Sequence, residues 1–344
     1  MKLMIAGIAL LASTSILAEM PSINWGGDFR YRYEAIDDGA SIGHKDHRQR
    51  IRARLNAHSE VIDKVHASIQ LASGNGAITS TNQTLGDGGS NKALDIDIFS
   101  IDWMFAKNAN ATLGKMKNPL HTVGNSDIVF DTDFTPEGAS VGYKTDLYFA
   151  SLNQFVIANN STSADVILYA PQAGINLGAG PVKFTIGGSW YNYSSMVNQS
   201  VTGSLSSAGN STAANFFQNG YKVLNGFAEM SGQVSHLSYS VFYDYIKNGE
   251  VETGDTGWLA GAKLKCHNWT LSYDYRWVET DATVGFLADG DVAGSLGTGL
   301  YGHRTDLGYA INKNVSTNAV YYAHTKMSNK QHYDKYQVNL VFKF

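Results

Sequence analysis

The chain has 344 residues and a formal net charge of −4 from 26 basic and 30 acidic side chains, so it lacks the basic excess typical of nucleic-acid-binding proteins. A single cysteine excludes an intramolecular disulfide framework, and no run of about eighteen apolar residues follows the first segment, which excludes a helical membrane protein. Aromatic residues make up 12% of the chain, with 19 Tyr against only 5 Pro, a composition that favours β-strands.

The first eighteen residues have the pattern of a secretory signal. Lys2 is followed by an apolar run from Leu3 to Leu17 and then by the small residue Ala18. This run is too short for a stable transmembrane helix, and its small terminal residue suits a cleavage site. We expect residues 1–18 to be a signal peptide and residues 19–344 to form a single domain, since no later change in composition marks a boundary.

Six of the eight arginines lie in the first two strand-like segments. Within each segment they occupy every second position, and the residues between them are apolar except Gln49: Arg30, Arg32, Arg48, Arg50, Arg52 and Arg54. Alternate side chains of a strand point to opposite faces, so the arginines share one face of a predicted hairpin. Neighbours on that face are about 6.6 Å apart and repel by about 0.6 kcal/mol in a water-like dielectric, more in drier surroundings. A packed core would not hold this arginine ladder, whereas a hydrated lumen could.

The predicted register of this hairpin sets Arg30 opposite Arg54 and Arg32 opposite Arg52. Apolar and polar residues alternate again in later segments, at 65–71, 182–190, 237–244, 258–265, 269–276 and 336–344. No helical periodicity competes with this pattern, so the chain is predicted to be all-β.

The connections between the predicted strands alternate between short and long. Seven short turns separate eight longer polar stretches, around 37–47, 74–93, 117–137, 158–164, 195–219, 247–256, 280–299 and 325–333. This rhythm predicts a transmembrane antiparallel β-barrel of about 16 strands, with short periplasmic turns and long external loops. The last segment, YQVNLVFKF, ends in an aromatic residue and resembles the assembly signal of bacterial outer-membrane barrels.

The third long stretch is rich in carboxylates. It contains G-K-x-x-N-P from Gly114 and then D-x-x-x-D-x-D-x-x-P-E-G from Asp127. With the start GDFRYRYE at Gly27 and the arginine-rich second strand, these motifs resemble bacterial porins, most closely the putative-porin family of Gram-negative outer membranes. The motifs are short, but the likeness in architecture spans the whole mature chain.

The resemblance implies a passive channel without a catalytic step or a cofactor. Loop 117–137 would fold into the barrel and narrow it, and its acids would face some or all of the arginine ladder: Asp127, Asp131, Asp133 and Glu137. In the alternative interpretation these acids lie on an exposed loop, and the arginines pair locally, for instance with Glu34. The implied partners are outer-membrane lipid and lipopolysaccharide together with ions and small hydrophilic solutes, but no nucleic acid. A homotrimer is suggested by analogy alone.

Three alternatives remain open at this point. Lumen-facing tyrosines such as Tyr191 and Tyr322 beside the ladder would also suit a channel specific for sugars or anionic solutes. An outer-membrane enzyme is disfavoured because the chain has no G-x-S-x-G or H-E-x-x-H motif. A secreted soluble binding protein would not explain the apolar face of nearly every strand. The acidic, glycine-rich loops lack calcium-loop spacing, so no metal is predicted.

Further charges on the predicted lumen faces do not settle the selectivity of such a channel. Basic and acidic candidates nearly balance: Lys183, Lys263, Lys265, Arg276 and Arg304 against Asp244, Asp274 and Asp306. An arginine wall nevertheless favours a modest preference for anions, which we state as an expectation.

Overall fold

A computed structural model describes residues 22–39, 46–161, 163–202 and 205–344. The predicted signal peptide, residues 1–18, lies outside the described residues. The strands are β1 (Asn24–Asp37), β2 (Asp46–Ile62), β3 (Val65–Ser73), β4 (Gln83–Thr84), β5 (Leu94–Ala106), β6 (Ala109–Lys115), β7 (Glu137–Lys144), β8 (Tyr148–Ala158), β9 (Val166–Tyr169), β10 (Gln172–Ala179), β11 (Val182–Tyr193), β12 (Thr212–Ala213), β13 (Phe216–Phe217), β14 (Tyr221–Val234), β15 (Leu237–Asn248), β16 (Thr256–Cys266), β17 (Trp269–Val278), β18 (Leu300–Ala310), β19 (Val315–Lys326) and β20 (His332–Lys343).

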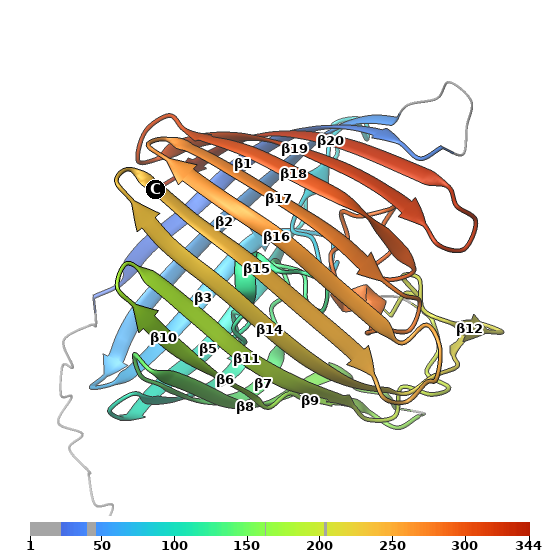
Figure 1. The fold of residues 1–344 in the computed structure, drawn as a ribbon, viewed down its shortest axis with the longest axis horizontal. Helices are drawn as coiled ribbons and strands as arrows, with labels where there is room; N and C mark the ends of the chain where they lie inside the picture. Colours follow the sequence, from blue (N-terminus) through green and yellow to red (C-terminus); the bar gives the residue numbers. More distant parts are fainter. Residues whose placement is uncertain (1–21, 40–45, 162, 203–204) are drawn as a thin grey trace, which may run out of the picture.

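These strands form a closed antiparallel barrel, as the sequence predicts (Figure 1). β9 and β10 pair with the same two neighbours and form one barrel strand, which is interrupted next to Pro171, a residue without a backbone donor. When this pair is counted once and the two-residue β4 is left aside, sixteen strands of the described chain surround the lumen. β12 and β13 form a separate small hairpin in a loop.

The barrel closes where the two ends of the chain meet. β1 pairs with β20 from Asp28 opposite Lys343 to Asp37 opposite Asp334. The backbone N–H of Gly27 donates to the terminal Phe344 carbonyl at 3.1 Å, and the Phe344 ring stacks on Phe29 with centroids 5.7 Å apart. The two end strands therefore have no free edge. An open edge would expose unpaired backbone groups to the bilayer, where they have no hydrogen-bond partners.

The two faces of the strands have different environments. On β1 the aromatic Phe29, Tyr31 and Tyr33 are exposed on the outside, whereas Asp28 and Arg32 are buried on the lumen side. The same division recurs around the barrel, so the outer surface presents apolar side chains and the interior is polar. Nowhere in the described ranges is there a helix long and apolar enough to cross a membrane.

The predicted register of the first hairpin is wrong by two residues. Arg30 lies opposite Arg52 and Arg32 opposite Arg50. The observed register sets an acid opposite an arginine near each end of the ladder, in the pairs Asp28–Arg54 and Glu34–Arg48. This arrangement lowers the like-charge repulsion that the predicted register would have left.

Two long loops and their short helices lie within the ring of strands (Figure 1). The first, residues 116–136, contains the 3₁₀ turn η1 (Val123–Asn125), and the second, residues 279–299, contains η2 (Gly285–Leu287). Their apolar side chains form part of one buried cluster that includes Phe130, Phe286 and Phe217. The hydrophobic core thus lies inside the barrel and holds these loops against the wall.

A charge on the outer face is expected to destabilise the barrel more than the same charge on the lumen face. Leu152 on β8 is 69% exposed and faces outward, so Leu152→Arg should cost about 2–4 kcal/mol near the bilayer midplane. Reversible unfolding in lipid vesicles measures this cost. The control Ser272→Arg adds its charge beside a lumen cavity and should cost less; equal costs for both variants would contradict the assigned faces.

Candidate channel constriction

The loop of residues 116–136 crosses the barrel and is fixed to its wall at several points. The backbone N–H of His121 donates to Gln172 of β10 at 2.7 Å, and that of Gly124 donates to Glu229 of β14 at 2.8 Å. Gly124 has a φ of 57°, and a Cβ there would lie 2.4 Å from the Phe242 ring. Only glycine allows this close approach of the loop backbone to the Phe242 ring.

Asp127 binds two arginines of the barrel wall that do not belong to the arginine ladder. Its carboxylate lies 2.9 Å from Arg276 of β17 and 2.9 Å from Arg304 of β18. The Arg276 side chain is only 2% exposed and also pairs with Asp274 at 3.0 Å and Asp289 at 3.4 Å. Asp127 lines one cavity with Arg30 and Arg52 of the ladder, but the ion pairs found for it among the described residues are with Arg276 and Arg304.

The other three predicted acids have different surroundings. Asp133 lies 3.6 Å from Arg52 and 3.7 Å from Arg54, so it is the loop acid that pairs with the ladder. Asp131 accepts the backbone N–H of Asp133 at 2.7 Å, and none of the ion pairs found among the described residues involves it. Glu137 belongs to β7, not to the loop, because it lies in register with Lys115 and pairs with it at 3.0 Å.

The second loop, residues 279–299, completes the same site. The N–H of Asp131 donates to the Leu287 carbonyl at 2.7 Å, and the N–H of Asp289 donates to the Asp127 carbonyl at 3.1 Å. Asp291 pairs with Arg32 at 3.1 Å and with Lys335 at 2.6 Å. The sequence pattern predicted an external loop here, and the apolar residues 284–287 are the signal that could have indicated burial.

Burial and neighbouring charges perturb the carboxyl groups of both loops. Burial, with the Asp289 and Asp133 carboxylates, raises the pKa of Asp131 well above its usual range. Burial and Asp127 raise the pKa of Asp289 to about 7, although Arg276 lowers it. Burial also raises the pKa of Asp291, but Lys335 and Arg32 outweigh it and hold that pKa well below the usual value. The constriction thus contains carboxyls of quite different proton affinity.

Five of the six ladder arginines form ion pairs with two acids of β1. Arg48 and Arg32 bind Glu34, Arg50 lies 3.7 Å from it, and Arg52 and Arg54 bind Asp28 at 2.8 and 2.6 Å. The predicted register placed Asp28 beyond the ladder, so the sequence did not indicate it as a partner of Arg54.

Arg30 differs from the rest of the ladder. It donates to the Asn82 side chain at 2.6 Å, but none of the ion pairs found in the described ranges involves it. Its Nε is buried and has no hydrogen-bond partner among the described residues. Arg30 therefore contributes a positive charge that has no ion-pair partner among the described residues.

A polar cavity of about 200 Å³ lies between these charges. Arg30, Arg52 and Arg304 line it together with Asp131 and Asp291. It adjoins a larger cavity of about 980 Å³ that extends to lumen residues near the short turns, and the two share several lining residues. No group of three or more His, Cys, Asp or Glu in the described part of the chain could hold a metal ion. This arrangement suits the passage of polar solutes, not covalent chemistry.

Solved structures with a similar fold are bacterial outer-membrane proteins. OprB of Pseudomonas putida in a high-pH structure matches with a TM-score of 0.63 and 10% identity over 94% of both chains. A double mutant of the Rhodopseudomonas blastica porin matches with a TM-score of 0.55 and 11% identity over 94% of this chain and all of that one. At this identity the similarity concerns the fold.

Comparison at the level of sequence assigns the family. No curated protein matches the chain. A family model described as "Putative porin" matches residues 15–225, more than half of the chain. The chain therefore belongs to the putative porin family and is an outer-membrane β-barrel channel, not an enzyme.

Proposed function

We propose that the protein is a general porin, which lets ions and small hydrophilic solutes diffuse passively through a charged constriction. The observation that carries this proposal is the polar cavity of about 200 Å³ lined by charges of both signs. Arg30, Arg32 and Arg52 of the arginine ladder contribute to its basic wall, and the two inward loops supply acids. A narrow, hydrated site of this kind admits polar molecules and excludes apolar ones.

Opposed charges in the constriction give it a transverse electric field. Arg30 and Arg52 lie on β1 and β2, while Asp131 and Asp291 come from the two loops. Such a field orients water and dipolar solutes, and low-dielectric walls strengthen it. Arginine suits this wall because its planar guanidinium stays charged and can bind several acceptors in one fixed geometry. The unpaired Arg30 gives the site a modest preference for anions.

The proposal includes the cellular setting of the channel. An N-terminal signal peptide, residues 1–18, directs export, and the apolar outer face contacts outer-membrane lipid and lipopolysaccharide. A homotrimer is part of the proposal by analogy, and chemical cross-linking of the unboiled, detergent-extracted protein tests it. Cross-linked species of monomer size alone would contradict a trimer.

A substrate-specific channel is the second candidate. The small volume of the cavity and the unpaired Arg30, held by Asn82, favour selection of anionic solutes. Liposome swelling distinguishes the two functions. A general pore should admit neutral and anionic solutes in order of size, whereas a specific channel should admit one class faster than its size predicts.

We predict that the protein forms ohmic channels in planar bilayers and that Arg30→Gln shifts their selectivity toward cations. Removing a charge about 7 Å from a permeating ion changes its energy by about 0.6 kcal/mol in a water-like dielectric, and the sign is opposite for an anion and a cation, so their permeability ratio should change about sevenfold. The reversal potential in a salt gradient measures this shift. Lys183→Gln, which removes an exposed charge near a short turn, is the matched control.

Folded protein without conductance would contradict the channel proposal. An unchanged reversal potential in Arg30→Gln would place Arg30 away from the permeation path.

A further inference from the structure

A third inward segment lies at the constriction beside the two long loops. It comprises residues 78–82 and follows β3. Its side chains line the cavity of about 200 Å³ at three positions: Thr79, Ser80 and Asn82. Ile78 packs against the buried apolar cluster of the inward loops. The segment therefore belongs to the wall of the constriction, although the alternation of short and long connections predicted an external loop here.

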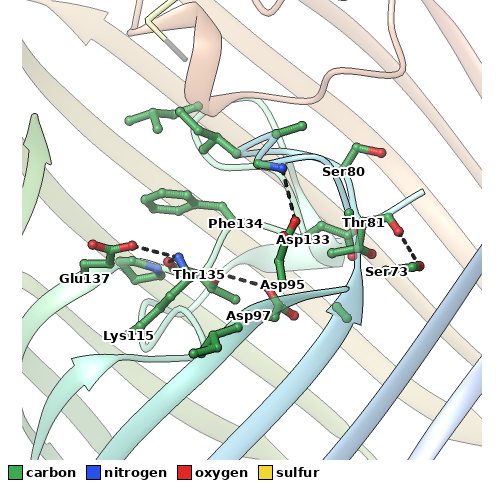
Figure 2. A pocket seen from close by; sticks show the side chains of 18 of the residues that line it. Ser73, Ser80, Thr81, Asp95, Asp97, Lys115, Asp133, Phe134, Thr135 and Glu137 are labelled. Atoms are coloured by element: carbon green, nitrogen blue, oxygen red, sulfur yellow. Dashed lines mark hydrogen bonds and ion pairs between the residues drawn. The ribbon is translucent and has the colours of Figure 1, made fainter. Parts of the chain in front are cut away.

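Hydrogen bonds fix this segment to β2, which carries four of the ladder arginines. The pairing of β2 with β3 does not reach Ala53, whose N–H donates instead to the Ser73 hydroxyl at 2.9 Å. That hydroxyl donates to the Thr81 carbonyl at 2.9 Å, a contact that Figure 2 shows. The short strand β4 then pairs with β2 at Arg50. Because both of its ends are bound to β2, the segment holds its side chains at defined places along the arginine ladder.

Asn82 and Ser80 connect two arginines of the ladder. Asn82 Oδ1 accepts from Arg30 Nη2 at 2.6 Å, and Asn82 Nδ2 donates to the Ser80 hydroxyl oxygen at 3.1 Å. The same hydroxyl oxygen accepts from Arg50 Nη2 at 3.4 Å. The amide of Asn82 has a single favourable orientation, because the reverse one would set its N–H donors against the donors of the Arg30 guanidinium. Asn82 is only 7% exposed, so solvent offers this amide little alternative bonding.

Arg30 differs from the other ladder arginines in the charge of the group that binds it. The other five lie within ion-pair distance of Glu34 or Asp28. Arg30 has the neutral amide of Asn82 in place of a carboxylate. A carboxylate would bind the guanidinium and also cancel its charge, whereas an amide oxygen binds it and carries no net charge. The choice of acceptor therefore decides how much positive charge the ladder presents to the cavity.

The contact with Asn82 also keeps Arg30 apart from the acids of the two loops. Asp131 and Asp291 line the same cavity, and none of the ion pairs found among the described residues joins Arg30 to either of them. An arginine side chain without an acceptor of its own would be attracted toward these carboxylates. The bond to Asn82 thus preserves the separation of positive and negative charge across the cavity.

We propose that Asn82 is a specificity-determining residue of the channel. As a neutral acceptor it positions the Arg30 guanidinium at the cavity and leaves its charge available to permeating ions. This role rests on the proposed porin function and deepens it, since it names the residue that maintains the anion preference. A carboxylate at position 82 cancels the charge of Arg30, and a side chain without an acceptor releases the guanidinium toward the acids of the loops.

Asn82→Asp tests the need for a neutral acceptor. The side chain keeps its size but forms an ion pair with Arg30, so the anion-to-cation permeability ratio should fall about sevenfold, as expected for Arg30→Gln. The reversal potential in a salt gradient measures this ratio. Asn176→Asp is the matched control, because it adds the same charge on β10, and Asn176 lines neither cavity at the constriction. Its effect should be much smaller, and an equal fall in both variants would overturn the proposal.

Asn82→Ala tests whether Asn82 acts through Arg30. The variant changes no charge, yet the permeability ratio should fall about threefold, which is half of the free-energy effect of Arg30→Gln. In the Arg30→Gln background the same substitution should cause no further change, whereas a structural role of Asn82 would shift the ratio equally in both backgrounds. Equal shifts, or no shift in Asn82→Ala, would overturn the proposal.

The remaining outcomes separate this role from the channel function itself. Heat-modifiable migration verifies that each variant is folded, and Asn82→Asp, which preserves the shape of the side chain, remains a test if Asn82→Ala does not fold. A wild-type protein that folds without conducting contradicts the proposed porin. An unchanged ratio in Arg30→Gln contradicts the proposed role of Arg30 and the role of Asn82 with it, whereas a shift in Arg30→Gln without one in Asn82→Asp contradicts the role of Asn82 alone.

Discussion

Replacing Asp127 with alanine is expected to increase the single-channel conductance and to make it fluctuate. The Asp127 carboxylate fixes the 116–136 loop to the wall through Arg276 and Arg304, both at 2.9 Å. Removing one partner of a buried ion pair costs about 3–5 kcal/mol, so the loop should leave its docked position for part of the time. The barrel itself should remain folded, because its strands pair independently of this loop. Single-channel recording and limited proteolysis of the loop measure the effect.

Glu137→Gln provides the matched control for this prediction. Glu137 carries the same charge in the same motif, but it is exposed and pairs only with Lys115, a contact worth about 0–1 kcal/mol. Its replacement should change neither the conductance nor the proteolysis. If Asp127→Ala stays heat-modifiable and conducts like the wild type, then the contact with Arg276 and Arg304 does not hold the loop.

The fold could be predicted from the sequence because every strand of a transmembrane barrel has the same alternation of lipid-facing and lumen-facing residues. Each strand must present apolar residues to lipid and polar residues to water. On β1, Phe29, Tyr31 and Tyr33 are exposed on the outer face, and they alternate with Asp28 and Arg32 on the lumen face. The register of the first hairpin could not be predicted in the same way. A shift of two residues keeps every side chain on its face, so only the charge pairs Asp28–Arg54 and Glu34–Arg48 distinguish the two registers.

The constriction was predicted in part, because its contacts join residues far apart in the chain. The sequence indicated an acidic third loop and an arginine ladder, yet Asp127 binds Arg276 and Arg304, which come from strands more than a hundred residues away. The second inward loop was missed for a related reason. Its acids, Asp289 and Asp291, are separated by one residue and carry no motif, and they acquire partners only when the barrel closes.

Acidification is expected to shift the selectivity of the channel toward anions, with most of the change near pH 7. Burial and Asp127 raise the pKa of Asp289 to about 7, so lowering the pH from 8 to 5 protonates this carboxyl and removes a negative charge from the constriction. Arg276 retains Asp127 and Asp274 as partners and stays in place. The reversal potential in a fixed salt gradient, recorded between pH 8 and pH 5, measures the shift.

The same titration should make the 279–299 loop dock more firmly in acid. The pKa of the Asp289 carboxyl is higher in the docked loop than its usual value of 3.8, so the carboxyl binds its proton more tightly there. The contribution of this proton to the stability of the docked loop is therefore complete below about pH 4 and is lost as the pH rises through 7. Asp289→Asn mimics the protonated form and should remove most of the pH dependence while keeping the anion preference of the acid state. If acidification shifts the selectivity toward cations, or if the selectivity of Asp289→Asn keeps the pH dependence of the wild type, then another group controls the selectivity. Asp131 is the group to test next in that event, because its pKa is also raised and its carboxylate accepts the Gly290 N–H of the same loop at 3.2 Å.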